Sequence, residues 1–181
     1  MDELDAILID ATAAIAREYY HLPIAQSVPI YRERVYCYEL YHQMRCLWGD
    51  SEYVLGGEVD KRGHRVLAEL NAANCVPDLL VHKPGHMDGN HAIIEIKASG
   101  DNQRQLTEPA IRTDLTKLQL FVQRVQYDRA VYLVYGTNAN DALAIRIANV
   151  ATDMNLECPV ELWFHSSWGQ AAARVGVLPN L

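Results

Sequence analysis

The sequence predicts an α/β protein with a mixed central β-sheet flanked by helices on both faces. Three observations favour this fold class. Short apolar runs of strand length alternate with longer segments in which apolar residues recur at helical spacing. The run at 129–136 is almost continuously apolar, as in a central strand covered on both faces. A Pro-Gly turn between two further runs predicts an antiparallel hairpin in the same sheet.

Length and composition are those of one globular domain. The chain has 181 residues, of which 50% are hydrophobic and 22% charged, so a sizeable core can be buried. No apolar run approaches the eighteen or more residues of a membrane span. The first residues are acidic and lack the basic region of a signal peptide. We therefore expect no membrane partner and a cytoplasmic location.

Cysteine spacing and net charge restrict the partners. The cysteines are scattered without a CxxC pair, which favours reduced thiols over a zinc site or a disulfide framework. A formal net charge of -7 argues against a protein that coats itself with nucleic acid. An acidic enzyme can still carry a local basic groove.

The order of predicted elements is two helices, three strands that include the hairpin, and then an alternation of helix and strand. Apolar periodicity predicts helices at 2–20, 31–48, 109–125 and 138–155. Apolar and β-branched runs predict strands at 53–59, 79–81, 92–96, 129–136 and 160–165. Strand–helix–strand links favour parallel neighbours with crossover helices. The role of the tail, 169–181, stays open, with an oligomer contact as one option.

The hairpin at 76–99 contains the residues that point to a chemical function. Asp78 opens its first strand, and Glu95 and Lys97 close its second. Side chains alternate along a strand, so Glu95 and Lys97 share one face while Ile94 and Ile96 occupy the other. If the two strands pair, Asp78 joins them, and two carboxylates and a lysine converge.

Such a convergence suits a hard divalent cation. Mg²⁺ prefers oxygen ligands, typically one or two carboxylates with water and substrate phosphate. Asp78 and Glu95 supply carboxylates, and the backbone carbonyl of Ile96 supplies a further oxygen. Mg²⁺ or Mn²⁺ there would activate water and neutralise charge on a phosphoryl group. Lys97 would orient or deprotonate the water, or pair with the phosphate.

Pro77-Asp78 followed by Glu95-Ile96-Lys97 resembles the PD-(D/E)xK motif of the restriction-endonuclease-like nuclease superfamily. The resemblance implies metal-ligand roles for Asp78 and Glu95 and a water-positioning role for Lys97. It covers about 31–136, with the N-terminal helix and the C-terminal α/β elements packed on that core in a single domain. It implies a restriction-endonuclease-like fold and a phosphodiester substrate, with DNA favoured over RNA.

The resemblance also suggests additional site residues, each with a simpler alternative. Glu39, on the predicted inward face of the second helix, matches an acid that approaches the metal in several members; alternatively it pairs with a nearby arginine or tyrosine. Glu58 competes for that role or is a solvated strand residue. Lys117 matches a Lys or Gln that faces the site, or it is a surface charge. His82, His86 and His91 flank the hairpin connection, where ordinary surface histidines are favoured over a metal site.

Two function classes stay open after this reading. The first is a metal-dependent nuclease, acting as a homodimer or with a partner protein. The second is a non-catalytic binding or assembly module that keeps the acids and the lysine as a structural ion pair. The intact set of Asp78, Glu95 and Lys97 favours the first class. The acidic balance and the lack of an appended DNA-reading domain favour the second.

Overall fold

The computed structural model describes residues 3–57, 75–100 and 106–181. This part of the chain forms a six-stranded sheet whose spatial order follows the sequence order, β1-β2-β3-β4-β5-β6. The strands are β1 (Val54–Gly57), β2 (Leu79–His82), β3 (Asn90–Ala98), β4 (Arg129–Tyr135), β5 (Val160–His165) and β6 (Ala173–Leu178).

Strand directions make the sheet mixed, as the sequence predicted. β1, β2 and β3 pair antiparallel, β3, β4 and β5 pair parallel, and β6 returns antiparallel to β5. The two parallel connections each contain a helix, since parallel neighbours require a crossover. A short connection with one 3-10 turn, η1 (Met87–Gly89), joins β2 to β3.

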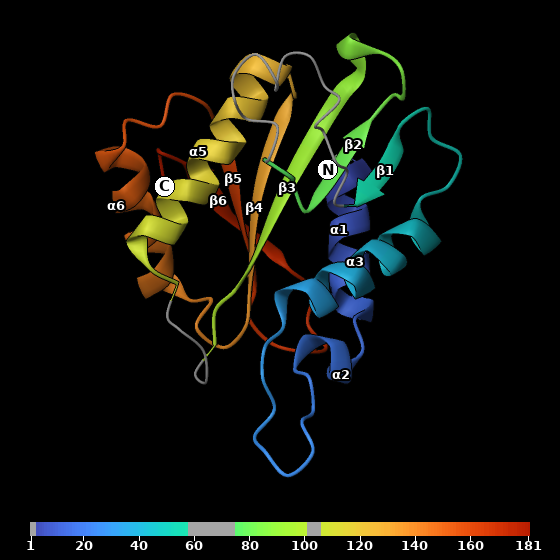
Figure 1. Cartoon of the computed structure of the whole chain (residues 1–181), viewed down its shortest axis with the longest axis vertical. Coiled ribbons are helices and arrows are strands. Elements are labelled where there is room, and N and C mark those ends of the chain that lie inside the picture. The colour runs from blue at the N-terminus through green and yellow to red at the C-terminus, as the bar shows by residue number, and fades with distance from the viewer. Residues whose placement is uncertain (1–2, 58–74, 101–105) are drawn as a thin grey trace.

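Helices cover both faces of the sheet (Figure 1). One face carries α1 (Glu3–Ala14), α2 (Arg17–Tyr20) and α3 (Glu33–Leu47), and the other carries α5 (Glu108–Val125) and α6 (Asp141–Asp153). The fold class is therefore α/β, with an open mixed sheet between two helical layers. None of the described helices is both long enough and apolar enough to cross a membrane.

β3 separates two hydrophobic cores. Ile94 and Ile96 are fully buried against α1 and α3, whereas Ile93 is buried against α5 and α6. The strict alternation of a strand places Glu95 and Lys97 on the α5 side. β4, the central strand predicted from its continuous apolar run, is buried along nearly its whole length.

The prediction of one helix over 2–20 was wrong. α1 ends at Ala14, and α2 is a separate short helix. The Thr12 hydroxyl donates to the Leu8 carbonyl at 2.7 Å and accepts from the Ala172 amide at 2.8 Å. The Trp168 indole donates to the Ile15 carbonyl at 3.1 Å. Tertiary contacts with the C-terminal segment thus replace helical hydrogen bonds at the break.

The inward face predicted for the second helix was also wrong. Tyr38, His42 and Cys46 are exposed, and the buried residues of α3 are Tyr36, Cys37, Leu40 and Met44. The buried stripe is the more apolar of the two, because the predicted one included Glu39 and His42. Burial of apolar area decided the orientation of the helix.

β6 lies in the tail for which the sequence predicted no element. It is an edge strand with mostly exposed side chains, so its sequence shows no clear apolar alternation. Its pairing with β5 closes this side of the sheet. The tail therefore belongs to the domain, and the suggestion of an oligomer contact there stays untested.

The ends of β3 and β4 meet closely at Ser99 and Gly136. The Ser99 amide donates to the Tyr135 carbonyl at 2.8 Å, and the Asn138 amide donates to the Ser99 carbonyl at 2.9 Å. Gly136 has φ +118°, and a Cβ atom there would collide with the Ser99 carbonyl oxygen. Glycine is required at this position because no other residue fits the conformation and the approach. The contact fixes the chain just beyond Lys97.

Candidate functional site

Asp78 reaches β3 because the register of the hairpin puts it there. Leu79, the first residue of β2, opposes Ile94, so the preceding residue, Asp78, lies beside Glu95 and Ile96 of β3. The Ile96 amide donates to Asp78 Oδ2 at 2.7 Å. The carboxylate thus extends the strand ladder beyond the first residue of β2, and its position is fixed by the backbone of β3.

Glu95 and Lys97 lie on the same face of β3, as predicted. Glu95 is 1% exposed, and its Oε1 atom accepts from Lys97 Nζ at 3.3 Å and from Lys117 Nζ at 2.7 Å. Lys117 comes from α5, which packs on this face of the sheet. The structure therefore brings together Asp78, Glu95, Lys97 and Lys117.

Lys97 contacts acids from two additional elements. Its Nζ lies 3.2 Å from Glu33 Oε1 at the start of α3 and 3.5 Å from Asp114 Oδ1 on α5. Burial lowers the pKa of Lys97, but Asp114, Glu33 and Glu95 outweigh it and raise the pKa above its ordinary value. Lys97 is consequently a charged ammonium group at neutral pH.

Asp114 is held by a buried tyrosine of the neighbouring strand. The Tyr132 hydroxyl donates to Asp114 Oδ2 at 3.1 Å, and Tyr132 is the β4 partner of Glu95 in the sheet register. Burial raises the pKa of Asp114 to about 6, although Lys97 opposes the shift. Fixed at one oxygen by Tyr132, Asp114 presents the other to Lys97.

Asp78 also resists ionisation. Burial, followed by the repulsion of Glu95, raises its pKa to about 7, and the hydrogen bond from the Ile96 amide opposes this rise only in part. The acids Asp78, Glu95, Glu33 and Asp114 thus outnumber the ammonium groups of Lys97 and Lys117. Closely spaced carboxylates whose ionisation is disfavoured are typical of a site that gains from an added cation.

The oxygen atoms at this edge of β3 fit a divalent metal ion. In an extended strand the N–H and C=O of one residue point to the same side, so the Ile96 carbonyl faces the edge to which its amide and Asp78 belong. Glu95 Oε2 is buried and has no hydrogen-bond partner among the described residues. Carboxylate and carbonyl oxygens are the ligands that Mg²⁺ and Mn²⁺ prefer. Within those same residues, no three or more His, Cys, Asp and Glu side chains form a preformed metal cage.

A hollow lies beside Asp78. Its volume is about 360 Å³, and the described residues that line it are Cys37, Tyr38, Tyr41, Gly57, Asp78 and Leu79. Tyr38 is 58% exposed. The ring therefore has a free face close to the acidic residue of the motif.

The structure does not place the additional predicted acids, Glu39 and Glu58, at the site as it does Lys117. Glu39 accepts a hydrogen bond from Gln43 Nε2 at 2.7 Å within α3, and its contacts do not include Lys97 or Glu95. Glu33, earlier on the same helix, is the α3 acid that touches Lys97. Glu58 lies outside the described residues.

Sequence reasoning missed Glu33, Asp114 and Tyr132 as site residues. Glu33 heads the stripe that continues through Tyr36, Cys37, Leu40 and Met44, so the correct helix face would have revealed it. Asp114 precedes Lys117 by less than one turn of α5, so both face the sheet. Nothing in the sequence distinguishes the Tyr132 hydroxyl from those of its neighbours on β4.

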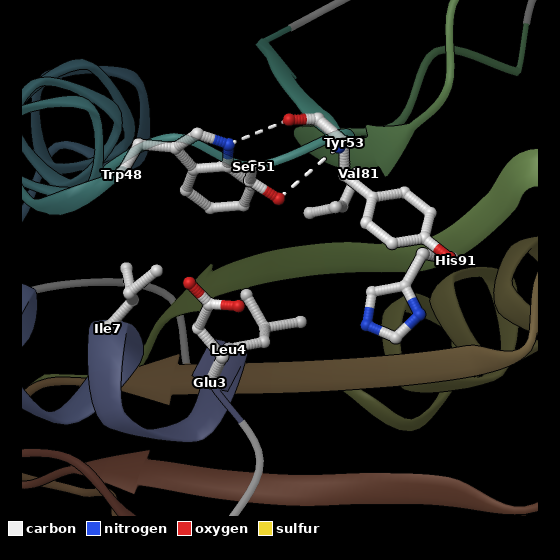
Figure 2. A pocket seen from close by; sticks show the side chains of 8 residues that line it. All are labelled: Glu3, Leu4, Ile7, Trp48, Ser51, Tyr53, Val81 and His91. Carbon is white, nitrogen blue, oxygen red and sulfur yellow. Dashed lines mark hydrogen bonds between the residues drawn. The ribbon is translucent and has the colours of Figure 1, made fainter.

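A second hollow of about 170 Å³ lies at the opposite end of β2 and β3. Figure 2 shows the Glu3 carboxylate and the His91 imidazole on either side of it, near the rings of Trp48 and Tyr53. His91 Nδ1 lies 3.8 Å from Asp128 Oδ2, and His86 is exposed. These contacts agree with ordinary roles for the hairpin histidines.

In comparisons with known proteins, no family model, no curated protein and no solved structure matched this chain.

Proposed function

We propose that the protein is a metal-dependent nuclease that hydrolyses phosphodiester bonds, with DNA as the favoured substrate. The observation that carries this proposal is the convergence of Asp78, Glu95 and Lys97 at the start of β2, beside the second half of β3. In this proposal the hairpin, α5 and β4 form the core of a restriction-endonuclease-like fold. The order of strand, strand, helix and parallel strand supports this assignment.

Asp78 and Glu95 would hold Mg²⁺ or Mn²⁺, with the Ile96 carbonyl as a further ligand. The bound ion would supply an activated water and charge neutralisation at the phosphoryl group. Burial of Glu95 and the backbone hydrogen bond to Asp78 hold both carboxylates in place before any ligand binds. The repulsion between the two carboxylates is thus overcome during folding, before the ion binds.

Lys97 would act as a positively charged positioning residue. Its surrounding acids keep it protonated, so it donates hydrogen bonds and does not accept the proton of the attacking water. Of the roles suggested by the sequence, orientation of the water and pairing with the phosphate fit this charge state. Glu33 and Asp114 would fix the ammonium group from opposite helical layers.

Nucleic acid would approach along the hollow beside Asp78. Tyr38 at its rim is suited to stack on a base, an interaction that every base allows. The net charge of -7 disfavours binding along a long phosphate backbone, so a partner protein would complete the binding surface. The basic residues Lys61, Arg62, His64 and Arg65 lie outside the described residues.

The alternative is a non-catalytic binding or assembly module. One observation favours it: Lys97 and Lys117 are already paired with Glu95, Glu33 and Asp114. Such a network also joins α3, β3 and α5 as a structural device. The two functions differ in whether the acids bind a metal ion.

A cleavage assay distinguishes them. The purified protein is incubated with single-stranded, double-stranded and branched DNA and with RNA, in Mg²⁺, Mn²⁺ or EDTA. Asp78→Asn and Lys97→Met are run beside the wild type, with Glu52→Gln as a control for the loss of an acid elsewhere. We expect metal-dependent cleavage that both site variants lose and the control retains. Cleavage that survives both site substitutions would refute the assignment.

A further inference from the structure

Lys117 forms an ion pair with the Glu95 carboxylate. Its Nζ lies 2.7 Å from Glu95 Oε1, the shortest of the ion-pair distances around Glu95 and Lys97, and 3.4 Å from the Val76 carbonyl. Both ends of the pair are shielded from water, since the Lys117 side chain is 18% exposed and that of Glu95 is 1% exposed. The ammonium group neutralises the buried acid within the folded chain.

A divalent ion and Lys117 cannot both bind the Glu95 carboxylate without weakening each other's binding. A Mg²⁺ ion lies about 2.1 Å from a carboxylate oxygen, so an ion on Oε1 would lie within roughly 5 Å of the ammonium group. Like charges at that distance repel strongly where water is excluded. An ion on Oε2 would avoid the closest approach but would share an acid whose charge Lys117 already offsets.

We infer that Lys117 is an internal competitor for the metal ion: it holds Glu95 in the metal-free protein and must leave the carboxylate when the ion binds. This inference rests on the proposed function, because it requires the metal site at Asp78 and Glu95. Lys97 differs from Lys117, since the Lys97 ammonium group forms ion pairs with three acids, Glu33, Glu95 and Asp114. Withdrawal of Lys117 therefore removes the closest cation from Glu95, while Lys97 keeps its contacts with Glu33 and Asp114.

The length of the lysine side chain makes such a withdrawal feasible. Lys117 lies on α5, whose backbone is fixed by the buried residues Ile111, Leu115, Leu118 and Phe121. Rotation about its side-chain bonds alone can move the ammonium group to solvent or to a substrate phosphate. No backbone rearrangement is required.

The test measures binding of Mn²⁺ alone by calorimetry, with wild type, Lys117→Met and Lys117→Gln. Removal of the competitor is expected to tighten Mn²⁺ binding by about tenfold, equivalent to about 1.4 kcal/mol. Lys117→Gln is the second variant, because its amide keeps a hydrogen-bond donor at this position if the methionine variant folds poorly.

Two controls separate competition from a general change of charge. Lys117→Arg keeps the cation and is expected to bind Mn²⁺ within about twofold of the wild type. Lys83→Met removes a lysine paired with Glu52 at 2.6 Å, at the other end of β2, and is expected to change affinity by less than about twofold.

The outcomes are distinguishable. If the wild type binds Mn²⁺ and the Lys117→Met and Lys117→Gln variants bind it no more tightly than Lys83→Met, the competition is refuted while the metal site stands. If neither the wild type nor any Lys117 variant binds Mn²⁺, the proposed metal site is wrong, and the competition fails with it.

Discussion

Replacement of Lys97 by methionine is expected to destabilise the metal-free protein. The substitution keeps the aliphatic stem and removes the ammonium group, which lies 3.2 Å from Glu33, 3.3 Å from Glu95 and 3.5 Å from Asp114. Glu95 and Asp114 are buried and lose a compensating charge. Loss of one partner of a buried pair costs about 3–5 kcal/mol.

The structure reduces this figure for two reasons. The Lys97 side chain is 19% exposed, and Glu95 retains Lys117 at 2.7 Å. We therefore expect a loss of about 2–3 kcal/mol at pH 8, which corresponds to roughly 4–12 °C in melting temperature for a domain of this size. Near pH 5 the loss is expected to shrink, because Asp78 and Asp114, with pKa values raised to about 7 and about 6, take up protons and the acids repel less.

Urea unfolding in EDTA at both pH values measures the effect. A double variant, Lys97→Met with Glu95→Gln, serves as the control, since it also removes the buried negative charge of Glu95 and is expected to restore part of the stability. Equal losses at pH 5 and pH 8, or a loss below about 0.5 kcal/mol at pH 8, would refute the account of a buried charge network.

Three additional predictions concern the same region. Asp78→Asn is expected to flatten the pH dependence of stability in EDTA. Because the pKa of Asp78 is raised from the ordinary value of 3.8 to about 7, the native state binds more protons than the unfolded state between these values, and wild-type stability falls as pH rises through this window. Thermal melts of the two proteins should therefore diverge there. Gly136→Ala is expected to cost about 2 kcal/mol or more, because of its φ of +118° and the collision with the Ser99 carbonyl, and a thermal melt close to that of the wild type would contradict this. Glu33→Gln is expected to lower nuclease activity about tenfold or more while the matched Glu39→Gln retains it, because Glu33 contacts Lys97 whereas Glu39 accepts from Gln43. Equal activities in a cleavage assay would remove Glu33 from the site.

The sequence predicted the parts of the fold that local patterns determine. The apolar runs at β4 and β5 and the apolar periodicity of α5 and α6 are local signals, and the structure has these elements close to their expected limits. The alternation of Glu95 and Lys97 against Ile94 and Ile96 likewise follows from strand geometry alone.

Features that depend on tertiary contacts were not predictable in this way. The break between α1 and α2 requires Trp168, which is distant in sequence, and β6 gains its strand pairing only from β5. The wrong face of α3 directed attention to Glu39 and away from Glu33, whose contact with Lys97 joins segments far apart in the chain. Site residues contributed by other elements are identified only when packing is known.

The most direct test of the metal-dependent site is the location of a bound ion. Crystals of the protein grown or soaked with Mn²⁺ are measured at the manganese absorption edge, where anomalous scattering identifies the ion. We expect one ion coordinated by Asp78 and Glu95, with the Ile96 carbonyl beside it and Lys117 withdrawn from Glu95. An ion bound elsewhere, for instance near Glu3 and His91, with Lys117 still paired with Glu95 would refute the proposed metal site.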